Sequence, residues 1–384
     1  MGAYWKLGTL VFGFILYVAD VGSDIYVAIQ YYKEGLIAPF ITTVVFTAIP
    51  VFIVNIFATY SLKKGHVTLK FASCFVHLAM VHLFIEELYR WKEDSEHSHN
   101  GKHFSKCECA DCINRFKSSC KATLDSTLVG YMEAFAESAP QCCFQVIVMR
   151  NSGGTPPWYR IASISVSFLS MLWNVYLLEK AYWVNRRVEQ DLTPATYPKK
   201  SAFVFVLWQL LLLLARFLTF AILASNYVVI FYLIIIHYIA IVNLMHWFFR
   251  KSSCRTRCII SVSCFVTSYP WHFHLSTSGL EVPNKCFHRE EDVVKIRKFI
   301  RYALILVPFL FALEGTILIL FFSELPETKM YIALGILGGT ILAAYVMSLI
   351  YYHSRYHPFP TVTQVRPIVV KRGIINVQPI NDDE

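Results

Sequence analysis

The chain has 384 residues, of which 56% are hydrophobic and 16% are charged, and its formal net charge is +9. Soluble domains carry roughly 25% charged residues, so this composition excludes an ordinary soluble protein. In so apolar a chain the positive charge favours basic loops on the cytoplasmic side of a membrane over binding to nucleic acid, and we expect no nucleic-acid partner.

Uninterrupted apolar runs predict helices that span a membrane. Such a helix needs about 20 apolar residues, and lipid cannot satisfy exposed backbone groups, so a spanning run must be helical. In chain order, the runs predict eight spans, at residues 7–31, 39–60, 122–149, 158–180, 202–224, 227–249, 302–322 and 330–352.

Two further apolar segments, near 67–88 and 258–275, are interpreted as re-entrant. The first contains Glu86 and Glu87, which are costly in a helix that faces lipid, and Pro270 breaks the second. If both segments enter and leave on the same side, most Lys and Arg residues lie together on the cytoplasmic side. The positive-inside rule favours this topology, with both termini cytoplasmic.

The order of the segments predicts two parallel repeats. Residues 1–180 contain two spans, a half-inserted segment and two more spans, and residues 201–352 repeat that order. Both repeats begin on the cytoplasmic side, so they are related by an axis along the membrane normal. A basic linker at 181–200 joins them, and residues 353–384 form a cytoplasmic tail.

Polar side chains at predicted membrane depth are the strongest functional signal. They are Asp20, Asp24, Glu133, Glu137, Gln141, Gln145, Arg216 and Glu314. A charge at mid-bilayer costs roughly 2.5–3.5 kcal/mol on insertion scales, so these groups should face the interior of the bundle. Five acids cannot all pair with one Arg, so some must be protonated, bound to a cation or solvated. The alternative is a purely structural role that holds helices together.

The spacing within the third span predicts a polar ladder. Glu133, Glu137, Gln141 and Gln145 follow one another at intervals of four, so they should lie on one helix face. Pro140 falls inside the ladder and removes one backbone hydrogen bond. By contrast, the Glu179–Lys180 pair is interpreted as interfacial, and Gly335, Gly338 and Gly339 are taken to indicate close helix packing.

Three short runs make the chain resemble the XK-related family of membrane proteins. They are residues 19–25, which include Ser23 between the paired Asp residues, the string Glu137-Ser138-Ala139-Pro140-Gln141, and residues 312–315. The resemblance extends over about residues 7–355. It implies an all-helical, pseudo-symmetric architecture of eight spans and two half-inserted segments, which agrees with the topology that the charges favour.

The resemblance implies scrambling of phospholipids such as phosphatidylserine at the plasma membrane, without ATP and, for several members, in apoptotic cells after caspase cleavage. It also implies that the polar residues at membrane depth form the lipid path or its scaffold. The tail offers only Asp382 and Asp383 as cleavage sites, so the activating trigger stays open. An ion- or proton-coupled transporter is one alternative. A scaffold for a lipid-transfer protein or a single-span subunit is another.

Cys and His residues crowd the predicted cytoplasmic loop at 90–121. They are His97, His99, His103, Cys107, Cys109, Cys112 and Cys120. These residue types bind zinc, but the spacing lacks paired Cys-x2-Cys units. Palmitoylation of a Cys and an ordinary solvated loop are the alternatives. No nucleotide-binding loop and no nucleophile–base arrangement is evident, so we expect neither an enzyme nor a cofactor.

Overall fold

The computed structural model describes residues 2–61, 78–96, 98–99, 102–103, 110–152, 155–189, 197–226 and 326–353. The spans predicted at 227–249 and 302–322, the half-inserted segment at 258–275 and the tail therefore lie outside the described residues. The same holds for residues 67–77 of the first half-inserted segment.

The described elements are almost all helices. They are α1 (Gly2–Lys33), α2 (Ile37–Ser61), α4 (Leu78–Glu96), α5 (Ala110–Glu133), a π-helical turn η2 (Ala134–Ser138), α6 (Ala139–Ser152), α7 (Trp158–Glu189), α8 (Lys199–Asn226) and α13 (Glu327–His353). A short antiparallel pair, β1 (Ser98–His99) and β2 (Lys102–His103), follows α4. Gly35 makes the tight turn between α1 and α2 at φ 74°, a conformation that glycine adopts readily.

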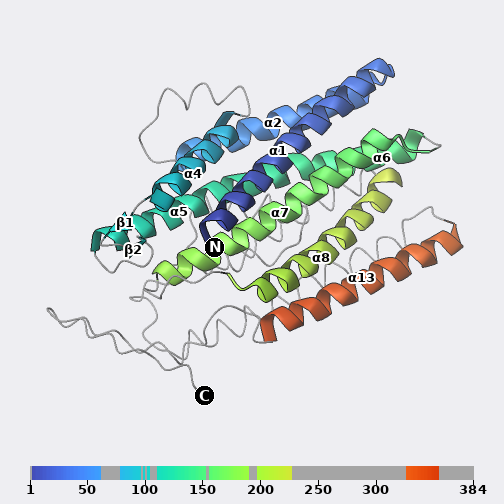
Figure 1. The fold of residues 1–384 in the computed structure, drawn as a ribbon. Coiled ribbons are helices and arrows are strands. Elements are labelled where there is room, and N and C mark those ends of the chain that lie inside the picture. Colours follow the sequence, from blue (N-terminus) through green and yellow to red (C-terminus); the bar gives the residue numbers. More distant parts are fainter. Residues whose placement is uncertain are drawn as a thin grey trace.

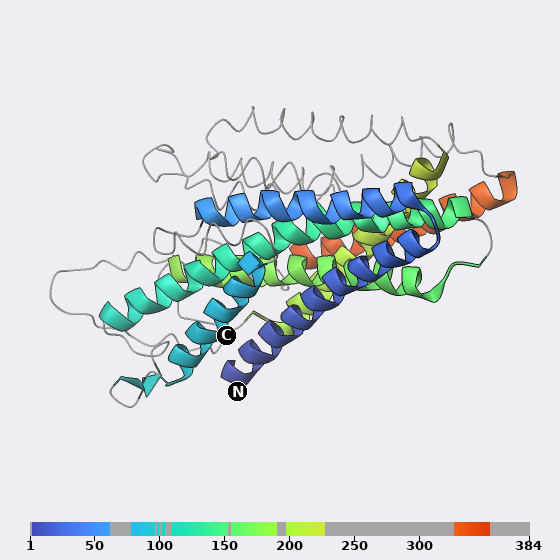
Figure 2. The same cartoon turned by 90° about the horizontal axis from the view of Figure 1, so that it is seen from above.

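The long helices form a bundle whose members run roughly side by side (Figure 1). The first residues of α1 and α8 and the last residues of α7 lie at one end, whereas the α1–α2 turn and the α6–α7 connection lie at the other. Figure 2 shows the same alternation from above, with α13 beside α8. This arrangement is consistent with spans that alternate in direction, and the assignment of one end to the cytoplasm stays a prediction.

Among the described residues, four helical segments are long and apolar enough to cross a membrane: Lys6–Lys33, Trp158–Asn185, Lys199–Thr219 and Thr328–Tyr351. Many of their large apolar side chains are exposed, such as Ile15 on α1 and Leu342 on α13. This outer surface suits contact with lipid chains rather than water. The predicted class, an all-helical protein with several membrane spans, is confirmed at this level. The count of eight spans and the parallel repeat stay predictions.

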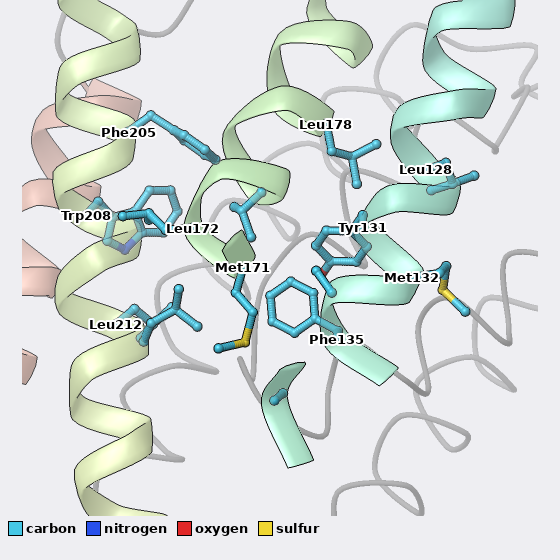
Figure 3. Packing of buried hydrophobic residues seen from close by; sticks show 14 of the residues in the cluster. Leu128, Tyr131, Met132, Phe135, Met171, Leu172, Leu178, Phe205, Trp208 and Leu212 are labelled. Carbon is cyan, nitrogen blue, oxygen red and sulfur yellow. The ribbon is translucent and has the colours of Figure 1, made fainter. Parts of the chain in front are cut away.

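The apolar core lies where α5, η2, α7 and α8 meet. Figure 3 shows Tyr131, Phe135, Met171, Phe205 and Trp208 gathered there, and all five are almost fully buried. The aromatic rings of Tyr131 and Phe135 are 4.6 Å apart, and those of Phe205 and Trp208 are 6.0 Å apart. This core fixes the rotation of α7 and so decides which of its residues face α1.

The helix that contains the predicted third span begins earlier than that span. Helix α5 starts at Ala110 and not near residue 122, so Cys112 and Cys120 lie on a helix, whereas the sequence placed them in a loop. The reason is tertiary: Arg115 of α5 forms an ion pair with Glu93 of α4 at 3.0 Å, and Thr123 donates a hydrogen bond to Glu87 at 3.2 Å. Contacts with α4 thus order a segment too polar to be recognised as part of a span.

The close helix contacts within the described residues involve a different glycine. A Cβ atom added to Gly335, Gly338 or Gly339 would meet no described atom within 4 Å, and close packing at these glycines stays a prediction, because the spans predicted at 227–249 and 302–322 lie outside the described residues. The close approach occurs instead at Gly130 of α5, where an added Cβ would lie 2.9 Å from Oδ1 of Asn174 on α7.

Candidate functional site: a buried polar core

Asp20 of α1 lies at the centre of a set of hydrogen bonds that join three elements. Ser138, at the end of η2, donates to Oδ2 of Asp20 at 2.6 Å, and Ser167 of α7 donates to Oδ1 at 2.5 Å. The carboxyl group is buried, with 4% of the residue exposed. Both of its oxygens therefore have a hydroxyl donor, as burial of a polar group requires.

Asp24 lies one helical turn further along α1, on the same face. Its Oδ1 accepts hydrogen bonds from Ser163 of α7 at 3.0 Å and from Nε2 of Gln145 on α6 at 3.2 Å. The same amide nitrogen of Gln145 also contacts the Ser163 hydroxyl at 2.9 Å, and Ser23 donates to that hydroxyl at 3.2 Å. The paired acids of α1 are thus held by serines and an amide rather than by a basic side chain.

The π-helical turn places Glu137 in this core. Because Pro140 has no N–H and its ring crowds the carbonyl four residues earlier, the turn before it widens and takes one extra residue. Glu137 is 2% exposed, and its two carboxyl oxygens have no hydrogen-bond partner among the described residues. Glu133, just before the turn, is also buried.

The predicted polar ladder is therefore interrupted, although all four of its residues are buried. Gln141 donates to the backbone oxygen of Thr43 at 3.0 Å and to Oγ1 of Thr47 at 2.8 Å, both on α2. Gln145 instead contacts α1 and α7. The two amides thus connect α6 to different neighbours, and they do not form one continuous track along a single face.

The core contains more acceptors than donors. Oδ2 of Asp24, both carboxyl oxygens of Glu137 and the amide oxygens of Gln141 and Gln145 are buried without a partner in the described part of the chain. No ion pair among the described residues involves Asp20 or any of these groups. Buried acceptors without partners are unfavourable, so this core suits species that donate hydrogen bonds: protons, water, or the ammonium or hydroxyl of a headgroup.

Two buried polar clusters were not predicted from the sequence. Arg160, near the start of α7, is only 2% exposed and forms an ion pair with Glu34 at 2.7 Å. Its guanidinium lies 4.8 Å from the centre of the Tyr31 ring and also donates to Ser152 at 3.3 Å. The sequence signal for this cluster was an Arg directly after two aromatic residues, Trp158 and Tyr159, together with an acid, Glu34, just after the first span.

Glu179 corrects the interfacial interpretation of the Glu179–Lys180 pair. The residue is 2% exposed, and Tyr351 of α13 donates to its Oε1 at 2.7 Å. The hydroxyl of Tyr351 also lies 3.0 Å from that of Tyr197, just before α8. The bond joins residues 172 positions apart, so no local sequence signal could have revealed it.

The remaining predicted residues divide as follows. Ala139 and Ser138 are buried beside Pro140, Arg216 belongs to α8, and Glu314 lies outside the described residues. Of the Cys and His candidates, His99 and His103 are in the strand pair, and Cys112 and Cys120 lie on α5 without a disulfide. The other three, His97, Cys107 and Cys109, lie outside the described residues. In the described part of the chain, no group of three or more His, Cys, Asp or Glu side chains could hold a metal ion.

Comparison with known proteins identifies the family. The family model for XK-related protein matches residues 8–358. The relative named Cell death abnormality protein 8 from Caenorhabditis briggsae is 28% identical over 285 residues, which cover 63% of this chain and 57% of the relative. Its namesake from Caenorhabditis elegans is 25% identical over 246 residues, covering 54% and 51%. The chain thus spans about half the length of these curated relatives, and it belongs to the XK-related protein family.

Proposed function

We propose that this protein is an ATP-independent phospholipid scramblase of the plasma membrane, which lets lipids such as phosphatidylserine exchange between the leaflets in apoptotic cells. The observation that supports it most is the buried polar core. Carboxyl and amide oxygens without partners lie inside a bundle whose outer surface is apolar.

The physical basis is the cost of moving a headgroup through hydrocarbon. A polar or charged group is strongly disfavoured there unless it finds partners. Asp24 and Glu137 have carboxyl oxygens available to an ammonium group, and Gln141 and Gln145 add amide oxygens. Such a core lowers the barrier equally for both directions and needs no energy source.

The relatives support the biological setting. Both carry the name Cell death abnormality protein 8, and membership of the XK-related family extends over nearly the whole chain. The partners that we propose are membrane phospholipids, with a single-span subunit or a lipid-transfer protein as accessory. This part of the proposal rests on the family and on the names of the relatives.

The test uses purified protein in liposomes that contain a phospholipid labelled on its acyl chain, with dithionite added outside. Protein is prepared from resting and from apoptotic cells, since the trigger is open. We expect loss of label beyond the outer half without ATP. In the active preparation, Glu137→Gln should slow the exchange about tenfold, equivalent to about 1.4 kcal/mol of barrier.

Asp111→Asn is the matched control, because it likewise replaces an acid with its amide, at an exposed residue in the first turn of α5. It should leave the rate unchanged. Quenching that stops near half of the label in every wild-type preparation would refute scrambling. Equal rates for Glu137→Gln and the wild type would remove Glu137 from the path.

An ion- or proton-coupled transporter is the second candidate. It is favoured by the four buried acids Asp20, Asp24, Glu133 and Glu137, for which no ion pair is found in the described bundle. A current across the liposome membrane that depends on pH or voltage would support this function. A preparation that shows neither current nor lipid exchange would favour the scaffold.

A further inference from the structure

Helix α4 presents three different faces, and the proposed function uses none of them. One face is buried: Met80 and Leu83 belong to the core, and the ring of Phe84 lies 5.2 Å from that of Phe14 on α1. A second face is apolar and exposed, with Ile85, Leu88 and Tyr89 between 45% and 67% accessible. The third is a charged stripe.

The charged stripe consists of His82, Glu86 and Arg90, at intervals of four on the flank of α4 next to α5. The imidazole of His82 lies 2.9 Å from Glu86, and Arg90 lies 3.8 Å from the other oxygen of Glu86. These side chains are 24% to 31% accessible, so the stripe is open to a ligand. Charges of both signs lie within one helical turn.

Other contacts, not Glu86, dock α4 onto α5. Glu87 accepts a hydrogen bond from Thr123 at 3.2 Å, and Arg90 donates to Glu87 at 2.9 Å and to Ser126 at 3.3 Å. In the described part of the chain, the ion pairs of Glu86 are all with residues of its own helix. Its carboxylate is therefore not needed to hold the two helices together, and its place beside an apolar exposed face calls for another explanation.

We propose that α4 captures a membrane phospholipid whose headgroup carries both a phosphate and a primary ammonium. Arg90 binds the phosphate and Glu86 binds the ammonium. The acyl chains lie on Ile85, Leu88 and Tyr89. The site lies toward the end of the bundle that holds the N-terminus (Figures 1 and 2), so it takes lipid from the leaflet on that side.

The chemistry of the stripe selects the headgroup. The positive charge of Arg90 is offset by the two neighbouring carboxylates, Glu86 and Glu87. The site therefore has no surplus of positive charge that would favour a purely anionic headgroup. A primary ammonium donates hydrogen bonds to a carboxylate, and a charge-assisted bond of this kind is strong, whereas a choline group has no N–H to donate. The adjoining apolar face favours a lipid over a free phosphate, because only a lipid buries that surface.

This inference rests on the proposed function, since it places one end of the same lipid route, but binding can be measured without transfer between leaflets. The full-length protein is placed in nanodiscs with lipids that carry a photoreactive acyl chain. Cross-linked α4 peptides are then quantified for ethanolamine, N-methyl, N,N-dimethyl and choline headgroups. We expect labelling of α4 to fall along this series as N–H donors are lost.

Glu86→Gln should reduce the preference for ethanolamine over choline about 2- to 5-fold, the upper range for an exposed ion pair. Asp111→Asn, at an exposed acid of the neighbouring helix α5, should leave it unchanged. Equal labelling by all four headgroups of the wild type would overturn the proposal, whether or not the variant folds. So would displacement of the lipid by inorganic phosphate alone. A protein that shows the preference but exchanges no lipid would retain this site and lose the proposed function.

Discussion

The hydroxyl of Tyr351 offers the sharpest test of how α13 is held against α7, the helix that carries Glu179. Tyr351→Phe removes the donor to Glu179 at 2.7 Å and the contact with Tyr197 at 3.0 Å. The ring itself stays in place, because it packs against Phe205 and Trp208 with centroid distances of 5.5 and 5.9 Å. The substitution therefore removes one polar atom and little apolar contact.

The expected cost follows from the burial of Glu179, which is 2% exposed. A hydrogen bond to a charged group contributes about 1.5–3 kcal/mol, and a buried carboxyl that loses its donor pays most of that amount. In a chain of this size each kcal/mol lowers the melting temperature by roughly 2 °C. We therefore expect Tyr351→Phe to melt about 3–6 °C below the wild type in detergent.

The assay is thermal unfolding of the purified protein, monitored by size-exclusion chromatography after heating. Tyr331→Phe is the control, because it makes the same change on the same helix at a residue that is 63% exposed. A double-mutant cycle with Glu179→Gln isolates the coupling between the two side chains. If Tyr351→Phe has the same melting temperature as the wild type and Tyr331→Phe, the hydrogen bond contributes nothing to stability and α13 is held by its apolar contacts alone.

Two further substitutions test packing and the end of the bundle opposite the N-terminus. Gly130→Ala should lower the melting temperature by several degrees, since overpacking costs roughly 1–3 kcal/mol. Gly338→Ala, where an added Cβ meets no described atom within 4 Å, should leave the melting temperature unchanged. Equal effects of the two substitutions would contradict the described contact of α5 with α7. Glu34→Gln should destabilise by about 1 kcal/mol, because Arg160 is buried whereas Glu34 is partly exposed. Thermal unfolding measures both, and an unchanged melting temperature in Glu34→Gln would show that the aromatic rings suffice for Arg160.

The acceptor-rich core explains why one arrangement supports both candidate functions. Carboxyl and amide oxygens without partners can receive an ammonium group, water or a proton. The structure holds Asp20 firmly between two serine hydroxyls, whereas Glu137 has no partner in the described bundle. Neutralising Glu137 should therefore affect transport more, and packing less, than neutralising Asp20.

The sequence alone determined the class of the protein and the family. Span length and the distribution of Lys and Arg are local properties, so they can be read without a fold. The cost of a charge in hydrocarbon also predicted that Asp20, Asp24, Glu133 and Glu137 face inward, and all four lie buried. The same reasoning failed where helices order polar segments through contacts with one another, as at the start of α5.

Only the tertiary structure decided the partners of each polar group. Helical periodicity gives the face on which a residue lies, but the rotation of that face against a neighbouring helix depends on the packing of the whole core. Hence the serines around Asp20 and the bond from Tyr351 to Glu179 had no signature in the sequence. The hydrogen bonds that shape the polar core join residues far apart in the chain, and the packed bundle alone brings them within reach.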